Sequence, residues 1–374
     1  MALDSSDDAI RVMVVDDSAV VRGLITRILE DDPQLSVTVS AANGLLAVEG
    51  LSKNEIDVIV LDIEMPVMDG LTALPKLLEV DPEAKIVMAS TLTARNADIS
   101  LRALAAGATD YVSKPTSSRE IMEGGGFRRE LIEKVRNLGL VRRKKAPVHL
   151  KPGQPSPTRP RGKAPPSAMP SRPVVLRNPG SAKPDILAIG SSTGGPQALF
   201  AMLKVLKPDI KIPVVITQHM PAKFTSILAQ HITRMTGWSC SEATDGDKLT
   251  SGHIHIAPGD YHMTVEREGT NRVVRLDQEP PENFCRPAVD PMFRSTANIF
   301  GERVLAVVLT GMGYDGAKGG QTIAEAGGTV IAQDEETSVV WGMPGAAAHA
   351  GICSAVLPLG DIAPYITRHA SRGG

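Results

Sequence analysis

Residues 185–196 read Asp-Ile-Leu-Ala-Ile-Gly-Ser-Ser-Thr-Gly-Gly-Pro. The apolar run from Ile186 to Ile189 is short and unbroken, which predicts a strand buried on both faces, as in a parallel sheet. After Pro196, apolar residues recur every three or four positions as far as Leu206, which predicts a helix. The stretch therefore predicts a strand, a tight turn of small residues and a helix.

The turn between this strand and helix is suited to chemistry. It would lift the Ser192 hydroxyl above the carboxyl edge of the sheet and aim the N–H groups of the helix start at the same place. Residues 190–194 fit the G-x-S-x-G nucleophile-elbow pattern with Ser192, rather than Ser191, at the apex. The alternative is that the small residues merely allow a close turn. A P-loop is excluded, because no Gly-Lys-Ser/Thr follows at the required spacing.

Length and composition indicate a globular protein of two domains. A chain of 374 residues is too long for one ordinary core, and 42% apolar with 22% charged residues is typical of globular proteins. The net charge of −2 argues against a protein whose whole surface binds nucleic acid. The three scattered cysteines lack metal-ligand spacing, the first residues are polar and acidic, and no apolar run could cross a bilayer. We therefore expect a soluble, cytoplasmic protein that is not embedded in a membrane.

The first part of the chain alternates buried strands with helices, which predicts a doubly wound parallel sheet. The expected strands are 11–15, 37–39, 57–62, 85–90 and 111–115. Asp16, Asp17 and Asp62 follow the first and third of them, at the sheet edge where such folds bind ligands. Clustered carboxylates repel one another unless a hard cation joins them, and oxygen ligands suit Mg²⁺.

Ser90 and Lys114 lie at two neighbouring strand ends, where they would suit a phosphoryl group on Asp62. Residues 9–123 resemble the flavodoxin-like receiver domain of two-component response regulators, through the Asp16-Asp17 pair, Asp62 in Leu-Asp-Ile-Glu-Met-Pro, and Lys114-Pro115. The resemblance implies that Asp62 accepts a phosphoryl group from a sensor histidine kinase, with Mg²⁺ near the three aspartates. It also implies that Ser90 and Lys114 form the phosphorylation switch, although the adjacent Thr91 leaves the hydroxyl open by one position.

Residues 124–182 are expected to be a helix end followed by a linker. A charged helix over 120–140 should break at the glycines 124–126, since each glycine disfavours a helix. From Leu140 to Lys183 the chain is rich in Pro, Lys and Arg, with no acidic residue, and cannot bury a core. This basic stretch could instead bind nucleic acid or an acidic partner. The absence of aromatic stacking residues favours a linker.

Residues 183–374 form the second predicted domain, a Rossmann-like parallel sheet. The strand at 212–217 leads to His219, and the strand at 303–310 leads to Asp315. Like Ser192, both side chains follow the carboxyl end of a buried strand, so one crevice can hold all three. A nucleophile, a base and an orienting acid make a triad. Its chain order of Ser, His, Asp differs from the Ser, Asp, His order of α/β-hydrolases, so another doubly wound sheet is expected.

Two other sites compete with the triad. Gly311, Gly313 and Gly316 follow a strand and open a helix, and the next strand ends at Asp334, which together complete a dinucleotide-binding fingerprint. Asp315 argues against this site, because its carboxylate would repel a pyrophosphate. The second competing site is a zinc site built from the histidines His253, His255 and His262, which lacks a clear set of further ligands; a surface or pocket-wall role is favoured for them.

The second domain resembles the chemotaxis protein-glutamate methylesterases of the CheB type. The resemblance rests on five motifs: Ile-Gly-Ser-Ser-Thr-Gly-Gly-Pro at 189–196, Gln-His-Met-Pro at 218–221, Ile-Ala-Pro-Gly-Asp at 256–260, Arg-Pro-Ala-Val-Asp at 286–290 and Leu-Thr-Gly-Met-Gly-Tyr-Asp-Gly at 309–316. It implies that Ser192 is the nucleophile, His219 the general base and Asp315 the orienting acid. It further implies that the backbone N–H groups of Thr193 and Met312 face the oxyanion.

The family resemblance implies hydrolysis of methylated glutamates on methyl-accepting chemotaxis receptors and deamidation of receptor glutamines, without a cofactor for the esterase reaction. It also implies that the unphosphorylated receiver covers the esterase cleft. Two rival functions remain, a receiver-controlled dinucleotide-dependent oxidoreductase and a receiver-controlled nucleic-acid binder using residues 142–183. Neither is favoured.

Overall fold

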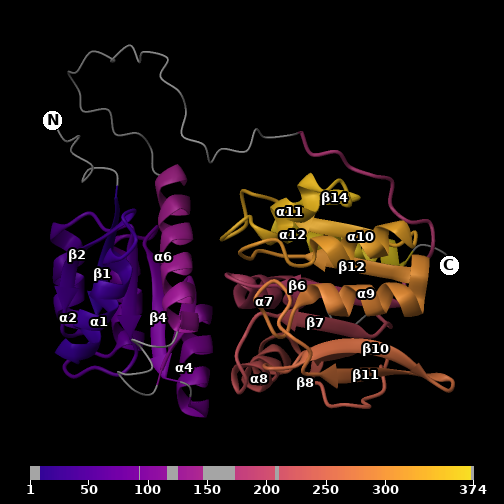
Figure 1. The fold of residues 1–374 in the computed structure, drawn as a ribbon, viewed down its shortest axis with the longest axis horizontal. Coiled ribbons are helices and arrows are strands. Elements are labelled where there is room, and N and C mark those ends of the chain that lie inside the picture. The colour runs from indigo at the N-terminus through magenta and orange to yellow at the C-terminus, as the bar shows by residue number, and fades with distance from the viewer. Residues whose placement is uncertain (1–8, 92, 116–124, 146–172, 207–209, 372–374) are drawn as a thin grey trace, which may run out of the picture.

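A computed structural model describes residues 9–91, 93–115, 125–145, 173–206 and 210–371 of the chain. It contains two parallel sheets, each with helices on both faces (Figure 1). The predicted fold class, two doubly wound α/β domains, is confirmed.

The N-terminal sheet has five parallel strands in the order β2-β1-β3-β4-β5. Its strands are β1 (Ile10–Val15), β2 (Leu35–Ala41), β3 (Val58–Asp62), β4 (Lys85–Thr91) and β5 (Asp110–Lys114). Its helices are α1 (Ala19–Glu30), α2 (Gly44–Lys53), α3 (Gly70–Val80), α4 (Ala94–Ala105) and α6 (Gly125–Lys145). Side chains of α1 and α6 pack on one face of the sheet, and those of α2, α3 and α4 pack on the other.

Short polar residues start the helices that follow the strands of this domain. The side chains of Ser18, Asn43, Asp69 and Thr93 each accept a hydrogen bond from a backbone N–H in the first turn of α1 to α4. Such caps satisfy donors that a helix start would otherwise leave free. They end each connecting loop at a defined residue and so keep the strand ends, with their acidic residues, at one edge of the sheet.

Helix α6 departs from the expected helix end and linker. It extends to Lys145, five residues past Leu140, so the linker cannot begin at residue 140. Ion pairs explain the extension: Arg142 contacts Asp81 at 2.9 Å, and Arg143 contacts the buried Asp57 at 3.0 Å. The glycine break expected at 124–126 lies partly outside the described residues, as do residues 146–172 of the expected linker.

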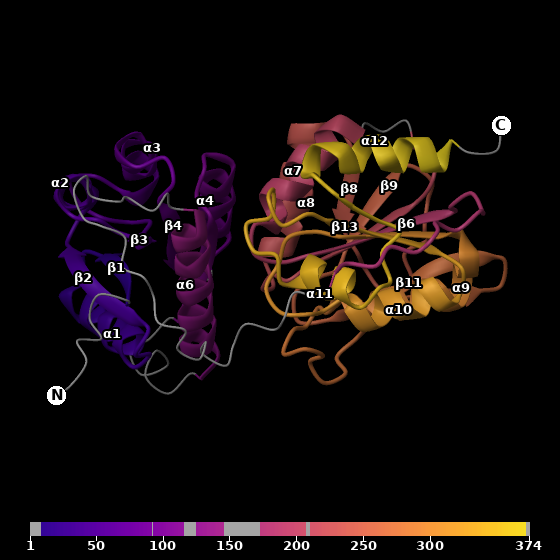
Figure 2. The same cartoon turned by 90° about the horizontal axis from the view of Figure 1, so that it is seen from above.

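The C-terminal sheet has seven parallel strands in the order β14-β13-β12-β6-β7-β9-β8. Its strands are β6 (Ile186–Ser191), β7 (Val214–Gln218), β8 (Ser239–Glu242), β9 (His253–Ile256), β12 (Val304–Val308), β13 (Thr329–Gln333) and β14 (Ala355–Leu357). Helices α7 (Gly195–Leu206), α8 (Phe224–Thr236) and α12 (Leu359–Ala370) pack on one face. Helices α9 (Val289–Phe300), α10 (Ala317–Glu325) and α11 (Met343–His349) lie on the other, as Figure 2 shows.

An antiparallel hairpin lies beside this sheet and was not anticipated from the sequence. It consists of β10 (His262–Glu268) and β11 (Asn271–Asp277), and a short 3-10 turn at Gly301–Arg303 follows α9 later in the chain. Val265 and Val274 of the hairpin pack into the core formed with α9. The hairpin therefore covers one side of the fold.

The two domains touch where α4 packs against α7 and α8 (Figure 2). Arg129 of α6 also contacts Phe284 of the second domain. Tyr111 stacks on Phe224 with ring centroids 4.6 Å apart. Gln197 Nε2 donates to the Ala108 carbonyl at 2.7 Å. Within the described ranges, no helix is long and apolar enough to cross a membrane.

Candidate active site

The β6–α7 turn presents Ser192 and buries Ser191. Ser191 is fully buried and its Oγ donates to Gln218 Oε1 at 2.7 Å, whereas Ser192 is half-buried and lines a cleft. Gln218 Nε2 donates to the Ser192 carbonyl at 2.9 Å, and the Ser192 N–H donates to the Thr310 carbonyl at 3.0 Å. Of the two adjacent serines, only Ser192 has a hydroxyl that a substrate could reach.

Gly311 allows the loop after β12 to approach the serine turn. A Cβ atom on Gly311 would lie 2.8 Å from Ser192 Cβ and would also collide with the Met343 sulfur. Real side chains do not tolerate such a distance, so this position must lack a side chain. Packing at the turn thus accounts for Gly311, the first glycine of the dinucleotide fingerprint.

His219 and Asp315 form a direct pair. His219 follows β7 and Asp315 follows β12, the strands on either side of β6. His219 Nε2 lies 2.7 Å from Asp315 Oδ2, and Asp315 is almost fully buried. Ser192, His219 and Asp315 all line the same cleft.

Donors surround the Asp315 carboxylate. It accepts hydrogen bonds from the backbone N–H groups of Val289 at 2.6 Å and Asp290 at 3.0 Å, and from Asn283 Nδ2 at 2.8 Å. Burial raises the pKa of Asp315, but the His219 contact and these backbone donors outweigh it and hold the pKa below its usual range. Asp315 is therefore a fixed anion that can orient an imidazole.

Asp290 is a second buried carboxylate beside the first. It accepts from the N–H groups of Gly316 at 3.0 Å and Gly319 at 2.7 Å, and from Asn283 Nδ2 at 2.9 Å. Burial and the nearby charge of Asp315 raise its pKa. Asp290 thereby ties α9 to the start of α10 and holds the loop that carries Asp315. Asp290 ends the motif at 286–290 that carries part of the family resemblance, and the sequence did not indicate this contact.

His219 also has a second partner. Its Nδ1 lies 3.4 Å from the sulfur of Cys285. Burial lowers the pKa of His219, but Cys285 and Asp315 more than offset it and raise the pKa to about 10. No hydrogen bond joins Ser192 to His219 among the residues that the structure describes.

Thr193 and Met312, whose backbone N–H groups are the expected oxyanion donors, both line the same cleft. Neither donates a hydrogen bond to another described residue, although Thr193 is buried. Buried N–H groups are almost always paired, so donors left without a partner beside a reactive serine are suited to an oxyanion.

The cleft has a volume of about 640 Å³ and is enclosed by both domains. On the first-domain side, α6 and β5 contribute Tyr111, Gly126, Arg129, Glu130, Glu133, Lys134, Arg136 and Asn137. The guanidinium carbon of Arg129 lies 4.3 Å from the centre of the Phe284 ring, which is next to Cys285. Helix α6 therefore lines the cleft that holds Ser192; the resemblance implied that the receiver covers this cleft, but not which element does so.

The competing sites lose support from the structure. Asp334, the acid of the dinucleotide fingerprint, accepts hydrogen bonds from the N–H and hydroxyl of Thr337 in a local turn.

The histidines of the expected zinc site have other partners. His262 is hydrogen-bonded to the Ala288 N–H and to the Pro280 carbonyl, and both ring nitrogens of His253 are hydrogen-bonded to serines. His255 is buried and both of its ring nitrogens lack a partner. Among the described residues, the three histidines do not form a metal-binding group.

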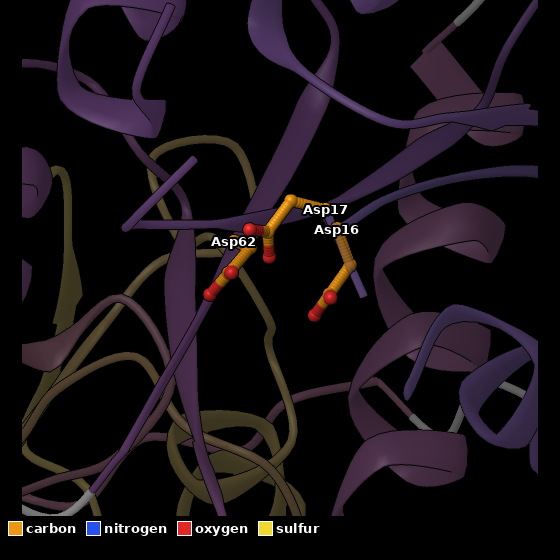
Figure 3. A group of neighbouring side chains, drawn as sticks. All are labelled: Asp16, Asp17 and Asp62. Carbon is orange, nitrogen blue, oxygen red and sulfur yellow. The ribbon is translucent and has the colours of Figure 1, made fainter. Parts of the chain in front are cut away.

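A second polar site lies at the carboxyl edge of the N-terminal sheet. Carboxylate oxygens of Asp16, Asp17 and Asp62 lie within 4.8 Å of one another, and Figure 3 shows the three side chains gathered at this edge. Lys114 Nζ donates to Asp16 at 3.0 Å and also contacts Asp62. Burial raises the pKa of Asp62 to about 6, against the opposing effect of Lys114. Burial lowers the pKa of Lys114, but Asp62 and Asp16 outweigh it and raise the value.

The structure does not distinguish between Ser90 and Thr91 as the hydroxyl of the phosphorylation switch. Ser90 is buried with its Oγ 3.1 Å from Ser100 Oγ, while Thr91 Oγ1 accepts from Asn96 Nδ2 at 2.7 Å. Both hydroxyls are bonded to α4 or its first turn. The assignment of Ser90 therefore stays a prediction.

Comparison with known proteins accounts for both domains. The profile of the CheB methylesterase family matches residues 187–366, and that of the response regulator receiver domain matches residues 12–124. The chain is 58% identical to a protein-glutamate methylesterase/protein-glutamine glutaminase 1 from Paramagnetospirillum magneticum, over the whole of both chains.

Two further relatives cover different shares of the chain. A protein-glutamate methylesterase/protein-glutamine glutaminase from Azospirillum brasilense is 57% identical over 98% of this chain and 94% of its own. The crystal structure of the Thermotoga maritima CheB methylesterase catalytic domain is 38% identical, with a TM-score of 0.49, and covers 50% of this chain and 99% of its own. With full-length identity of this level, the chain belongs to the CheB methylesterase family, with an N-terminal response regulator receiver domain.

Proposed function

We propose that this chain is a phosphorylation-activated protein-glutamate methylesterase that also deamidates glutamine side chains. Its substrates are methyl-accepting chemotaxis receptors, and it works in the cytoplasm, as its cysteine usage favours. The observation that carries the proposal is the His219–Asp315 pair at 2.7 Å in the cleft that also holds Ser192. The names of full-length relatives, protein-glutamate methylesterase/protein-glutamine glutaminase, support a reaction at glutamate and glutamine side chains of proteins.

In the proposed reaction, neutral His219 takes the proton of Ser192 as its Oγ bonds to the γ-carboxyl carbon of a glutamate methyl ester. The oxyanion that forms is stabilised by the N–H groups of Thr193 and Met312, typically worth about 3–4 kcal/mol for each donor. His219 then returns the proton to the methoxy group, and methanol leaves an acyl-enzyme. Water, deprotonated by His219, hydrolyses it to glutamate. A glutamine amide in the same place would release ammonia.

In the receiver, we propose that a sensor histidine kinase supplies the phosphoryl group that Asp62 accepts. The three aspartates fit Mg²⁺, because they offer only oxygen ligands and Asp17 remains exposed toward solvent. The bound ion would supply positive charge beside the phosphoryl oxygens. Lys114 and Ser90 would respond to the new group. The domains proposed for these roles are residues 9–123 and 183–374, joined by 124–182.

Methanol release from methylated receptor tests the esterase. We expect full-length Ser192→Ala, supplied with acetyl phosphate, to lose at least about 10³-fold in kcat. Ser191→Ala is the matched control and should keep most of the activity, because the Ser191 hydroxyl is buried and donates to Gln218. Equal release from wild type and Ser192→Ala would contradict the assignment of the nucleophile.

Stimulation by acetyl phosphate tests the receiver. We expect Asp62→Asn to retain unstimulated methanol release and to lose the increase that acetyl phosphate gives the wild type, since no acceptor carboxylate remains. The same stimulation of wild type and variant would show that Asp62 is not the acceptor.

A further inference from the structure

The segment 283–285 touches both members of the proposed acid–base pair. Asn283 donates to Asp315 at 2.8 Å, and Cys285 lies 3.4 Å from His219 Nδ1. Asn283 and Phe284 both have positive φ, at 52° and 64°, a conformation that residues with side chains adopt rarely. Strained backbone persists where surrounding contacts hold it, and it concentrates at functional sites.

Both nitrogens of the His219 ring are engaged. Nε2 faces Asp315 and Nδ1 faces Cys285, so neither is directed to Ser192. The Asp315 contact belongs to a buried carboxylate fixed by backbone donors. The contact to the sulfur is longer, and Cys285 is only half-buried. A neutral imidazole has one acceptor nitrogen, which cannot serve Cys285 and Ser192 together.

We propose that Cys285 is a positioning residue that holds the second ring nitrogen of His219 in the resting enzyme and competes with Ser192 for it. This inference rests on the proposed function. While Nε2 is held by Asp315 and Nδ1 by Cys285, neither ring nitrogen can accept the Ser192 proton. The ring serves Ser192 only after it leaves Cys285.

The position of Phe284 connects this contact to the receiver. Arg129 of α6 lies over the Phe284 ring at 4.3 Å, and Phe284 is the residue that precedes Cys285. Movement of α6 away from the cleft would remove that contact and loosen the segment. The state of the catalytic base would then depend on the position of α6, in addition to the physical covering of the cleft.

Several charged and titratable groups surround His219. Cys285 and Asp315 contact the ring, and Asp290 lies behind Asp315. The other charged groups that line the cleft are Arg129, Glu130, Glu133, Lys134 and Arg136 of α6, with Asp260 and Arg286 from the second domain. Cys285 and Asp315 raise the pKa of His219 to about 10, against burial, which lowers it. Removal of Cys285 should therefore lower this pKa and leave the Asp315 contact in place.

The test is the titration of the His219 ring nitrogens by NMR in the full-length chain, which does not depend on esterase activity. We expect Cys285→Ala to lower the pKa of His219 by at least about one unit, a tenfold larger neutral fraction at a given pH. Cys285→Ser, which replaces the sulfur with a smaller hydroxyl group, should show the same lowering and serves if the alanine variant does not fold. Cys353→Ala is the matched control, because burial raises the pKa of that thiol to about 12 and it lies outside the cleft.

A His219 titration in Cys285→Ser or Cys285→Ala that matches the wild type would overturn the proposal. A lowered pKa, with the acidic limb of the kcat/KM profile displaced by the same amount, would support it. If the pKa falls and Ser192→Ala still releases methanol, the positioning role stands and the proposed nucleophile is wrong. The two hypotheses are thus separated by one set of variants.

Discussion

Asp62 is ionised at neutral pH at a cost in folding free energy. Burial raises its pKa from 3.8 to about 6, although Lys114 opposes the shift. Because the folded-state pKa is the higher one, the stability that Asp62 contributes is complete below about pH 4 and is lost as pH rises through about 6. A carboxylate kept ready for phosphorylation therefore destabilises the receiver under working conditions.

We predict that Asp62→Asn stabilises the receiver at pH 7 by up to about 3 kcal/mol, because two pKa units correspond to that free energy. Urea unfolding of the full-length chain, following the receiver transition, measures it. The gain should vanish at pH 4, where the wild-type carboxyl is protonated. Mg²⁺ should stabilise the wild type and have less effect on the variant. A variant no more stable than wild type at pH 7 would contradict this account.

Single residues of the site differ in how far the sequence could locate them. Ser192, His219 and Asp315 each follow a recognisable buried strand, so a parallel sheet was enough to predict that they meet. Cys285 and Asn283 follow no such strand. Their contacts depend on a loop folded back over the cleft by tertiary packing, and nothing in local spacing specifies that path.

At the scale of elements, the buried parallel strands were predictable and the half-exposed ones were not. β6, β7, β12 and β13 are short apolar runs with flanking glycines or polar residues, and the predicted strands overlap them. β10 and β11 alternate apolar residues with many charged ones and are partly solvated, so the sequence signal is weak. The extension of α6 depends on ion pairs with Asp57 and Asp81, which are distant in sequence.

The meeting of the β6 and β12 turns yields a prediction. Gly311→Ala would place a Cβ atom 2.8 Å from Ser192 Cβ and force the turns apart. Because displacement of a nucleophile by about 1 Å can cost about 10²-fold, we expect kcat to fall by about that factor. Gly237→Ala is the control: Gly237 has φ of 78° with open space around it, so it should lose about 1 kcal/mol of stability and keep its kcat. Normal methanol release by Gly311→Ala would show that the turns can separate harmlessly.

At the scale of the whole molecule, the receiver contacts the esterase domain through several modest interactions. Besides the Tyr111–Phe224 stack, His231 Nε2 lies 2.8 Å from Asp98 Oδ1, and Arg129 lies over Phe284. Each of these contacts is modest on its own, about 0.5–1.5 kcal/mol for an aromatic pair or a cation–π contact. A switch operated by one phosphoryl group requires such a balance, because the group can shift an equilibrium only by its differential interaction with the two states.

Arg129→Ala should weaken the closed arrangement, because it removes the contact with Phe284 and leaves the proposed triad and the phosphorylation site unchanged. A cation–π contact at a partly exposed position is worth about 0.5–1 kcal/mol, which corresponds to a change of about two- to fivefold in the ratio of closed to open molecules. We expect unstimulated methanol release to rise by that factor, and the relative stimulation by acetyl phosphate to shrink equally, because the fully open activity is unchanged. Arg128→Ala is the matched control, since Arg128 pairs with Asp31 inside the receiver at 2.7 Å. If both variants behaved as the wild type, closure would have to depend on β5 and α4 instead, through Tyr111 and Asp98.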